Sequence, residues 1–141
     1  MTTIVRRIEF SAGHRLCQHE GKCAHLHGHN YTAYFHIEAE ALDDVGRVLD
    51  FAAIKERIGG WIEANWDHGF VCYKEDHEAI RALQSISGQK LFLLDRNPTA
   101  ENLARYLLEV VGPKQLAGTN ARVTRVDLWE TENCQANATL K

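Results

Sequence analysis

Imidazole and thiol groups gather in one short stretch of this sequence. Five of the eight histidines lie between positions 14 and 29, and a cysteine stands among them at position 23. These are the side chains that bind transition metals or transfer protons near neutral pH. The stretch therefore predicts a metal site, an acid–base site, or both together.

Two predicted strands would position these groups. Residues 4–14 and 29–40 alternate between apolar and polar side chains, which is typical of half-buried strands. If the two form a hairpin, His14 ends the first strand where His27 and His29 enter the second. All three belong to the core-facing parity, and neighbouring strands lie about 4.8 Å apart. Three imidazoles can then meet around one metal ion and leave its fourth position open, as in catalytic zinc sites.

Spacing alone leaves the ligand set open. His25 shares the parity of the core-facing histidines, and His19 lies in the connecting loop, so either is a further candidate. Zinc is preferred because imidazole suits it, although iron, copper and nickel accept such ligands too. The alternative to a metal site is that His14, His27 and His29 are ordinary polar residues at a strand end. This alternative is weaker because three histidines are expected to converge.

Four residues besides these histidines carry possible proton or binding chemistry: Cys23 within the stretch, and Asp67, His68 and Glu130 further along the chain. Cys23 follows Lys22 in a polar loop, where nearby cations or a metal favour a thiolate base over an inert buried thiol. A carboxylate such as Asp67 can fix the tautomer of an imidazole such as His68 and so support acid–base catalysis. Side chains of adjacent residues rarely form a good hydrogen bond with each other, however. An ordinary polar helix end is therefore an equal alternative for Asp67 and His68. Glu130 ends an apolar strand face, where an unpaired charge is costly. Unless it is a surface carboxylate, it needs a partner such as a ligand with adjacent N–H groups.

Composition limits the class of protein. The chain has 141 residues, of which 45% are hydrophobic and 25% charged, so one globular domain over residues 1–141 is expected. A net charge of −3 gives no strong attraction to nucleic acid or anionic membranes. The start lacks the apolar run of a signal peptide, and no stretch is long enough to span a bilayer. We therefore expect a cytoplasmic protein without nucleic-acid or membrane partners.

Two helices are predicted in the middle of the chain. Asp50 is a plausible N-cap for a helix over 51–65, which has one apolar face. A second helix has Asn97 or Thr99 as its cap, and Gly112-Pro113 is expected to end it.

Further strands complete the predicted pattern. Alternation indicates strands at about 122–131 and 135–141. The order β-β-α-α-β-β predicts an α+β fold, a four-stranded antiparallel sheet with two helices on one face. Between the helices, Phe70–Tyr73 and Leu91–Leu94 could pair as short strands around a small helix at 77–83. Because such a sheet has two open edges, assembly into an oligomer by edge pairing is favoured.

Several motifs occur in the order seen in one enzyme family. They are Phe10-Ser11-Ala12-Gly13-His14, Lys22-Cys23 followed by His27-Gly28-His29-Asn30-Tyr31, Asp50-Phe51, Asp67-His68, Pro98-Thr99-Ala100-Glu101-Asn102 and Trp129-Glu130-Thr131. The pattern resembles the 6-pyruvoyl-/6-carboxy-tetrahydropterin synthase family over nearly the whole chain. Its Cys-x-x-x-His-Gly-His element is the most specific part.

The resemblance implies an architecture and a role for each candidate residue. The architecture is the tunnelling fold (T-fold), whose subunits join their sheets into a barrel as homotrimers or homohexamers with active sites between subunits. The implied roles are zinc ligation by His14, His27 and His29, proton abstraction by Cys23, partner acid–base catalysis by Asp67 and His68, and anchoring of the pterin in the catalytic site by Glu130 with help from Thr99.

The resemblance also implies a zinc-dependent lyase acting on 7,8-dihydroneopterin triphosphate. The carboxy branch releases acetaldehyde and triphosphate and yields 6-carboxy-5,6,7,8-tetrahydropterin, a queuosine precursor; the short loop 15–26 and Val48-Leu49-Asp50-Phe51 favour it. The pyruvoyl branch eliminates triphosphate in the tetrahydrobiopterin pathway and keeps the side chain as 6-pyruvoyl-tetrahydropterin. Two alternatives from other classes are a non-catalytic zinc-binding oligomer, with Cys23 as a fourth ligand, and a Cys-His-Asp hydrolase.

Overall fold

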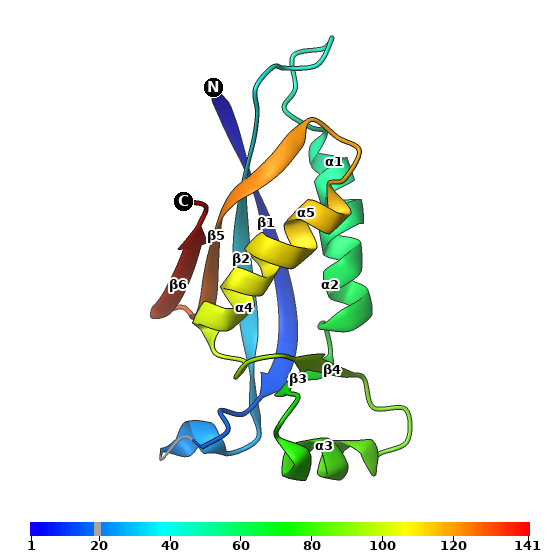
Figure 1. Ribbon diagram of the computed structural model, residues 1–141, viewed down its shortest axis with the longest axis vertical. Helices are drawn as coiled ribbons and strands as arrows, with labels where there is room; N and C mark the ends of the chain where they lie inside the picture. The colour runs from blue at the N-terminus through cyan, green and yellow to red at the C-terminus, as the bar shows by residue number, and fades with distance from the viewer. Residues whose placement is uncertain (19–20) are drawn as a thin grey trace.

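The computed structural model contains a curved sheet with two long strands at its centre (Figure 1). β1 (Thr2–His14) pairs antiparallel with β2 (His27–Ala39) along its whole length. Beyond β2, β5 (Ala121–Thr131) and β6 (Cys134–Thr139) continue the sheet as antiparallel neighbours. The predicted hairpin and both predicted C-terminal strands are therefore confirmed.

The prediction of a four-stranded, purely antiparallel sheet is wrong. The sheet has six strands in the order β4-β3-β1-β2-β5-β6. β3 (Gly69–Tyr73) runs parallel to the end of β1 and to β4 (Leu91–Leu94), and α3 (His77–Gln84) connects the two short strands. Gly13 permits this addition, because a Cβ atom there would collide with the ring of Phe70.

The first long helix consists of α1 (Phe51–Ile54), the π-helical turn η2 (Lys55–Gly59) and α2 (Gly60–Asn65). Its N-cap is Asp50, whose carboxylate accepts a hydrogen bond from the Ala52 N–H at 3.0 Å, as predicted. Its buried face begins at Ile54 rather than at Phe51, whose side chain is 50% exposed.

The second long helix consists of α4 (Ala100–Tyr106), the π-helical turn η3 (Leu107–Val111) and α5 (Gly112–Gln115). Thr99, not Asn97, is its N-cap, accepting a hydrogen bond from the Asn102 N–H at 3.1 Å. The predicted stop at Gly112-Pro113 is wrong. Pro113 follows the π-helical turn and stands in the first turn of a new α-helical segment, where its fixed φ and missing N–H are tolerated.

The main core lies between the sheet and these helices and extends beneath the end of the β1–β2 hairpin. There the rings of Phe10 and Tyr31 stack with centroids 5.0 Å apart, and Trp66 lies 5.7 Å from Phe10. Trp66 is fully buried and directly precedes Asp67 and His68. The core therefore fixes the end of the first helix against the end of the hairpin.

The structure describes residues 1–18 and 21–141, so the candidate ligand His19 lies outside the described residues. Within those ranges, no helix has the length and apolar character needed to cross a membrane.

An ion pair fastens α3 to the start of the loop that follows β1. Arg15 donates two hydrogen bonds to Asp76, from Nε at 2.7 Å and from Nη2 at 2.6 Å, and the Asp76 side chain is only 4% exposed. These hydrogen bonds hold the pKa of Asp76 below its ordinary value. Stabilisation from this pair is therefore present above the unfolded-state pKa, about 3.9, and is lost as the pH falls through the lowered value of the folded state.

We expect Asp76→Asn to lower the free energy of unfolding at pH 7 by about 1.5–3 kcal/mol, because Arg15 loses a charged acceptor in a site largely shielded from water. Urea unfolding measures the change. Glu78→Gln is the matched control, since the Glu78 side chain is 85% exposed and its carboxylate lies 3.4 Å from Arg15 Nη2, further than the Asp76 carboxylate. A loss for Glu78→Gln as large as that for Asp76→Asn would contradict the assignment.

Candidate functional site

Three imidazoles converge at the end of the β1–β2 hairpin. The strand register places His14 opposite His27 and places His29 opposite Ala12. The ring centroids lie 4.7 to 5.1 Å apart, and one nitrogen from each ring lies within 4.8 Å of the others. This is the convergence that the strand parity predicts. Among the described residues, this is also the only group of three or more histidine, cysteine or acidic side chains so arranged.

Backbone carbonyls orient two of the three rings. His14 Nδ1 lies 2.7 Å from the Pro98 carbonyl oxygen, and His27 Nδ1 lies 2.7 Å from the His25 carbonyl oxygen. Because a carbonyl only accepts, each Nδ1 carries the hydrogen and each Nε2 keeps a lone pair. Such outer hydrogen bonds are typical of metal-binding histidines.

The Nε2 atoms of His14 and His29 are buried and have no hydrogen-bond partner. Buried polar atoms are nearly always satisfied, and because these two belong to one converging group, a single shared ligand would satisfy both. Zinc, copper, iron and nickel all accept three imidazole nitrogens, and the residues present fit such a cation.

Burial favours the neutral form of two of these imidazoles, His14 and His29. His14 is only 2% exposed, and burial is the main cause that lowers its pKa, followed by opposing effects of the Pro98 hydrogen bond and the neighbouring imidazoles. Burial likewise lowers the pKa of His29 despite the nearby Glu130 carboxylate. A neutral imidazole is the form that ligates a metal, so the site is prepared for a cation at neutral pH.

His25 contributes a carbonyl group rather than an imidazole. Its own ring is exposed and is not part of the converging group. The sequence left His25 open as a ligand, and its backbone hydrogen bond to His27 accounts for its position instead.

Asp67 and His68 contact each other directly. His68 Nδ1 lies 3.0 Å from Asp67 Oδ2, although the two residues are adjacent in sequence. The contact accompanies a backbone φ of 59° at His68, a left-handed conformation that is uncommon for residues other than glycine. The geometry therefore favours the acid–base interpretation over a plain helix end.

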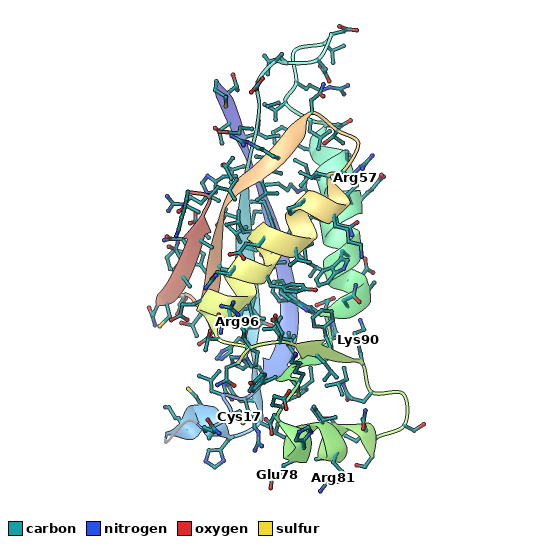
Figure 2. All side chains as sticks on the ribbon, viewed as in Figure 1. Cys17, Arg57, Glu78, Arg81, Lys90 and Arg96 are labelled. Atoms are coloured by element: carbon teal, nitrogen blue, oxygen red, sulfur yellow. The ribbon has the colours of Figure 1, made fainter. Side chains whose placement is uncertain are left out.

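Strand β1 and Lys90 hold this pair in place. The Ser11 N–H donates to Asp67 Oδ1 at 2.9 Å, and the His68 N–H donates to the Ser11 carbonyl at 2.7 Å. Lys90 Nζ donates to the Asp67 carbonyl at 2.6 Å, and its side chain reaches the end of α2 (Figure 2). Burial opposes ionisation of Asp67, but the hydrogen bonds from Ser11 and His68 and the charges of His68 and Lys90 outweigh it, so its pKa is lowered.

His68 opens onto a hollow of about 300 Å³ that is also lined by seven residues of the neighbouring strands, Ser11, Ala12, Gly13, Gly28, His29, Asn30 and Gly69. Side chains alternate along a strand, so Ser11, Gly13, Gly28 and Asn30 face away from the side of the sheet that carries His14, whereas Ala12 and His29 belong to that side. The His68 side chain is 81% exposed, and no hydrogen bond or ring contact joins it to the three imidazoles within the described residues. Within one chain, His68 therefore shares this hollow with His29 but makes none of these contacts with the histidine cluster.

Cys23 lies in the loop between the two central strands. It is half-buried in the short 3-10 turn η1 (Lys22–Ala24), and its carbonyl accepts a hydrogen bond from the Leu16 N–H at 2.8 Å. Its sulfur is not part of the converging group of ligand atoms found among the described residues. The cluster is therefore a three-imidazole set, as in open metal sites. Cys72, in contrast, is buried, and burial raises its pKa to about 11, which suits a packing role.

Glu130 and Thr99 complete the set of predicted residues. Glu130 Oε1 lies 3.6 Å from His29 Nε2, so this carboxylate borders the histidine cluster. Thr99 Oγ1 is engaged as the cap of α4, while its own O–H remains able to donate.

The sequence did not single out Ser11, Lys90 or the carbonyl groups of Pro98 and His25. Ser11, Pro98 and His25 act through backbone atoms, which no pattern of side chains marks, and Lys90 acts through its ammonium group on a carbonyl 23 residues away. The one available signal was the position of Pro98 directly before the cap of α4, because a carbonyl there lies outside the hydrogen bonds of the helix.

Comparison with known proteins identifies relatives. The family model described as 6-pyruvoyl tetrahydropterin synthase matches residues 3–140. The chain is 42% identical to a 6-carboxy-5,6,7,8-tetrahydropterin synthase of Rickettsia bellii over 134 residues, which cover 95% of this chain and 97% of the relative.

Solved structures share the fold. A protein from Wolinella succinogenes described as uncharacterized superposes with a TM-score of 0.81 at 23% identity, covering 99% of this chain and 98% of that one. The 6-pyruvoyl tetrahydropterin synthase of Caenorhabditis elegans superposes with a TM-score of 0.70, also at 23% identity, covering 99% and 96% of the two chains.

Proposed function

Because the chain belongs to the 6-pyruvoyl tetrahydropterin synthase family, we propose that it converts 7,8-dihydroneopterin triphosphate to 6-carboxy-5,6,7,8-tetrahydropterin, releasing acetaldehyde and triphosphate. The high identity to a relative named for the carboxy product favours this branch over the pyruvoyl branch. The product then serves queuosine biosynthesis. The observation that carries the metal-dependent part is the pair of buried Nε2 atoms without partners.

In this proposal His14, His27 and His29 hold one zinc ion through Nε2. When bound, zinc would polarise the side-chain hydroxyls of the substrate and make them and the adjacent carbon easier to deprotonate. The carbonyls of Pro98 and His25 fix two of the rings, and burial favours the neutral forms of His14 and His29.

Cys23 and the Asp67–His68 pair move the protons. The Cys23 thiolate takes a proton from the substrate side chain, and His68 returns one elsewhere on the substrate. The ionised Asp67 accepts the His68 Nδ1–H and so stabilises the imidazolium that His68 forms in turn. Triphosphate leaves, and one water molecule is consumed as the remaining side chain is cleaved, which leaves a carboxylate on the pterin and releases acetaldehyde.

Glu130 anchors the pterin, assisted by the Thr99 hydroxyl. A carboxylate that accepts two parallel N–H groups suits the guanidine-like edge of a pterin. The 3.6 Å contact between Glu130 and His29 supports binding of that edge beside the proposed zinc ligands.

For Glu130→Gln we expect kcat/KM for the pterin substrate to fall about 100-fold or more, because an amide cannot accept both N–H groups. Steady-state kinetics measures the effect. Glu132→Gln, at an exposed position two residues later, is the matched control and should behave like the wild type. Equal kinetics for Glu130→Gln and the wild type would rule out this anchoring role.

The active site is completed between subunits of a homotrimer or homohexamer. Two features support this. Four of the seven other residues that line the His68 hollow belong to the sheet face opposite to the histidine cluster. In addition, β3 pairs with β1 only at Ala12 and Gly13, which leaves residues 2–11 of β1 without a partner strand on that side among the described residues. Edge pairing between copies would cover the exposed backbone groups and join the sheets into a barrel. Light scattering on the purified protein determines the assembly.

Incubation of the zinc-loaded protein with 7,8-dihydroneopterin triphosphate tests the reaction. Acetaldehyde together with 6-carboxytetrahydropterin, identified by mass spectrometry, is the expected result. A 6-pyruvoyl product would instead indicate the other branch, and unchanged substrate would overturn the proposed function.

A further inference from the structure

The loop that carries Cys23 is held by a side chain far away in the sequence. This thiol loop, residues 15–26, connects β1 and β2. The Asn97 side-chain amide forms two hydrogen bonds with the backbone of Cys17: its oxygen accepts from the Cys17 N–H at 2.9 Å, and its nitrogen donates to the Cys17 carbonyl at 3.0 Å. Asn97 thereby satisfies both backbone groups of one loop residue, as a neighbouring strand would.

The constraint that Asn97 places on the Cys17 backbone extends to the backbone of Cys23. Leu16, the residue before Cys17, donates its N–H to the Cys23 carbonyl at 2.8 Å. A connected path of hydrogen bonds and covalent structure therefore runs from Asn97 through Cys17 and Leu16 to Cys23. Figure 2 shows Cys17 in the loop below the sheet and Arg96, which directly precedes Asn97, at the start of α4.

The same turn also orients a histidine of the metal centre. Pro98, next to Asn97, accepts the His14 Nδ1–H at 2.7 Å. The Asn97 carbonyl accepts hydrogen bonds from the Thr99 N–H at 2.8 Å and from Asn102 Nδ2 at 2.9 Å, which fasten the turn to α4. One rigid turn thus contacts the thiol loop through Asn97 and the histidine cluster through Pro98.

We propose that Asn97 is a positioning residue that holds the Cys23 thiol in register with the three-histidine centre. Its effect on turnover rests on the proposed function, in which Cys23 takes a proton from the substrate. Catalytic groups must sit close to their reactive geometry, and a displacement of about 1 Å can lower turnover about 100-fold. The two hydrogen bonds to Cys17 supply that placement without touching the substrate.

The test compares Asn97→Leu, which removes both hydrogen bonds at similar volume, with Asn97→Asp, which keeps only the acceptor. Both are made in the full-length, zinc-loaded protein. Val111→Ala is the control for general destabilisation, because Val111 is buried in the second long helix. For Asn97→Leu we expect kcat to fall about 100-fold with zinc content unchanged and KM within about threefold of the wild type. Asn97→Asp should give an intermediate kcat, and Val111→Ala should keep the wild-type value.

Amide hydrogen exchange tests the path without any assay of activity. The Cys17 N–H should lose protection in Asn97→Leu because its acceptor is gone, and the Leu16 N–H should lose protection as well if the constraint reaches Cys23. The proposal is overturned if Leu16 stays protected, or if Asn97→Leu keeps the wild-type kcat in an active enzyme. If the wild type itself leaves the substrate unchanged while both amides lose protection, the proposed function fails but the positioning of the loop stands.

Discussion

Replacing Cys23 with alanine should lower kcat by about 10²- to 10⁴-fold, the range that one acid–base group contributes. Zinc content should remain at the wild-type level, because the converging ligand atoms all belong to histidines. The half-buried thiol lies in the loop directly before β2, the strand that carries His27 and His29. Turnover assays and elemental analysis of the same sample measure the two quantities together.

Cys134→Ala provides the control for this experiment, since Cys134 is an exposed thiol at the start of β6. It should retain wild-type turnover. If Cys23→Ala loses zinc together with activity, the thiol is a fourth ligand and the protein is better described as a closed zinc site. If the activity of the wild type survives removal of the metal by a chelator, a Cys-His-Asp hydrolase becomes the better interpretation.

Replacing His14 with alanine should abolish both zinc binding and turnover. His14 is the most deeply buried of the three imidazoles, and two ligands rarely hold zinc in competition with water. The change also leaves the Pro98 carbonyl without its donor, which should lower the free energy of unfolding by about 1–3 kcal/mol. Elemental analysis and calorimetry measure the two effects.

His25→Ala separates the role of the ring from that of the backbone. The exposed ring is lost, but the backbone carbonyl that orients His27 remains, so zinc content should stay at the wild-type level. A loss of zinc in His25→Ala comparable to that in His14→Ala would place His25 among the ligands and change the assigned set.

The features that could be predicted from the sequence depend on local periodicity. The alternation in β1 and β2 determines which side of the sheet each residue occupies, so the convergence of His14, His27 and His29 follows from parity. The position of Asp50 as a cap follows equally from short-range chemistry.

The features that could not be predicted depend on contacts between distant segments. Parallel pairing of β3 with β1 requires Gly13 to accommodate the ring of Phe70, and no periodicity in either segment encodes that fit. The contact between Asp67 and His68 requires a left-handed backbone at His68, which Ser11 supports from β1. The tautomers of His14 and His27 depend on backbone carbonyls whose positions are known only once the chain has folded.

The short separation of the three histidines along the chain has a consequence for the order of folding. All three lie between positions 14 and 29, so closing the hairpin that unites them costs little loop entropy. The turn at Pro98 and the pair at Asp67 and His68 come from segments much further along the chain. If the proposed function holds, the hairpin already carries the three ligands, the His25 carbonyl and Cys23, so we expect it to capture the metal early and expect Pro98 and the Asp67–His68 pair to arrive later. Stopped-flow refolding would show this order as zinc-dependent acceleration of the earliest phase, and no effect of zinc on that phase would exclude it.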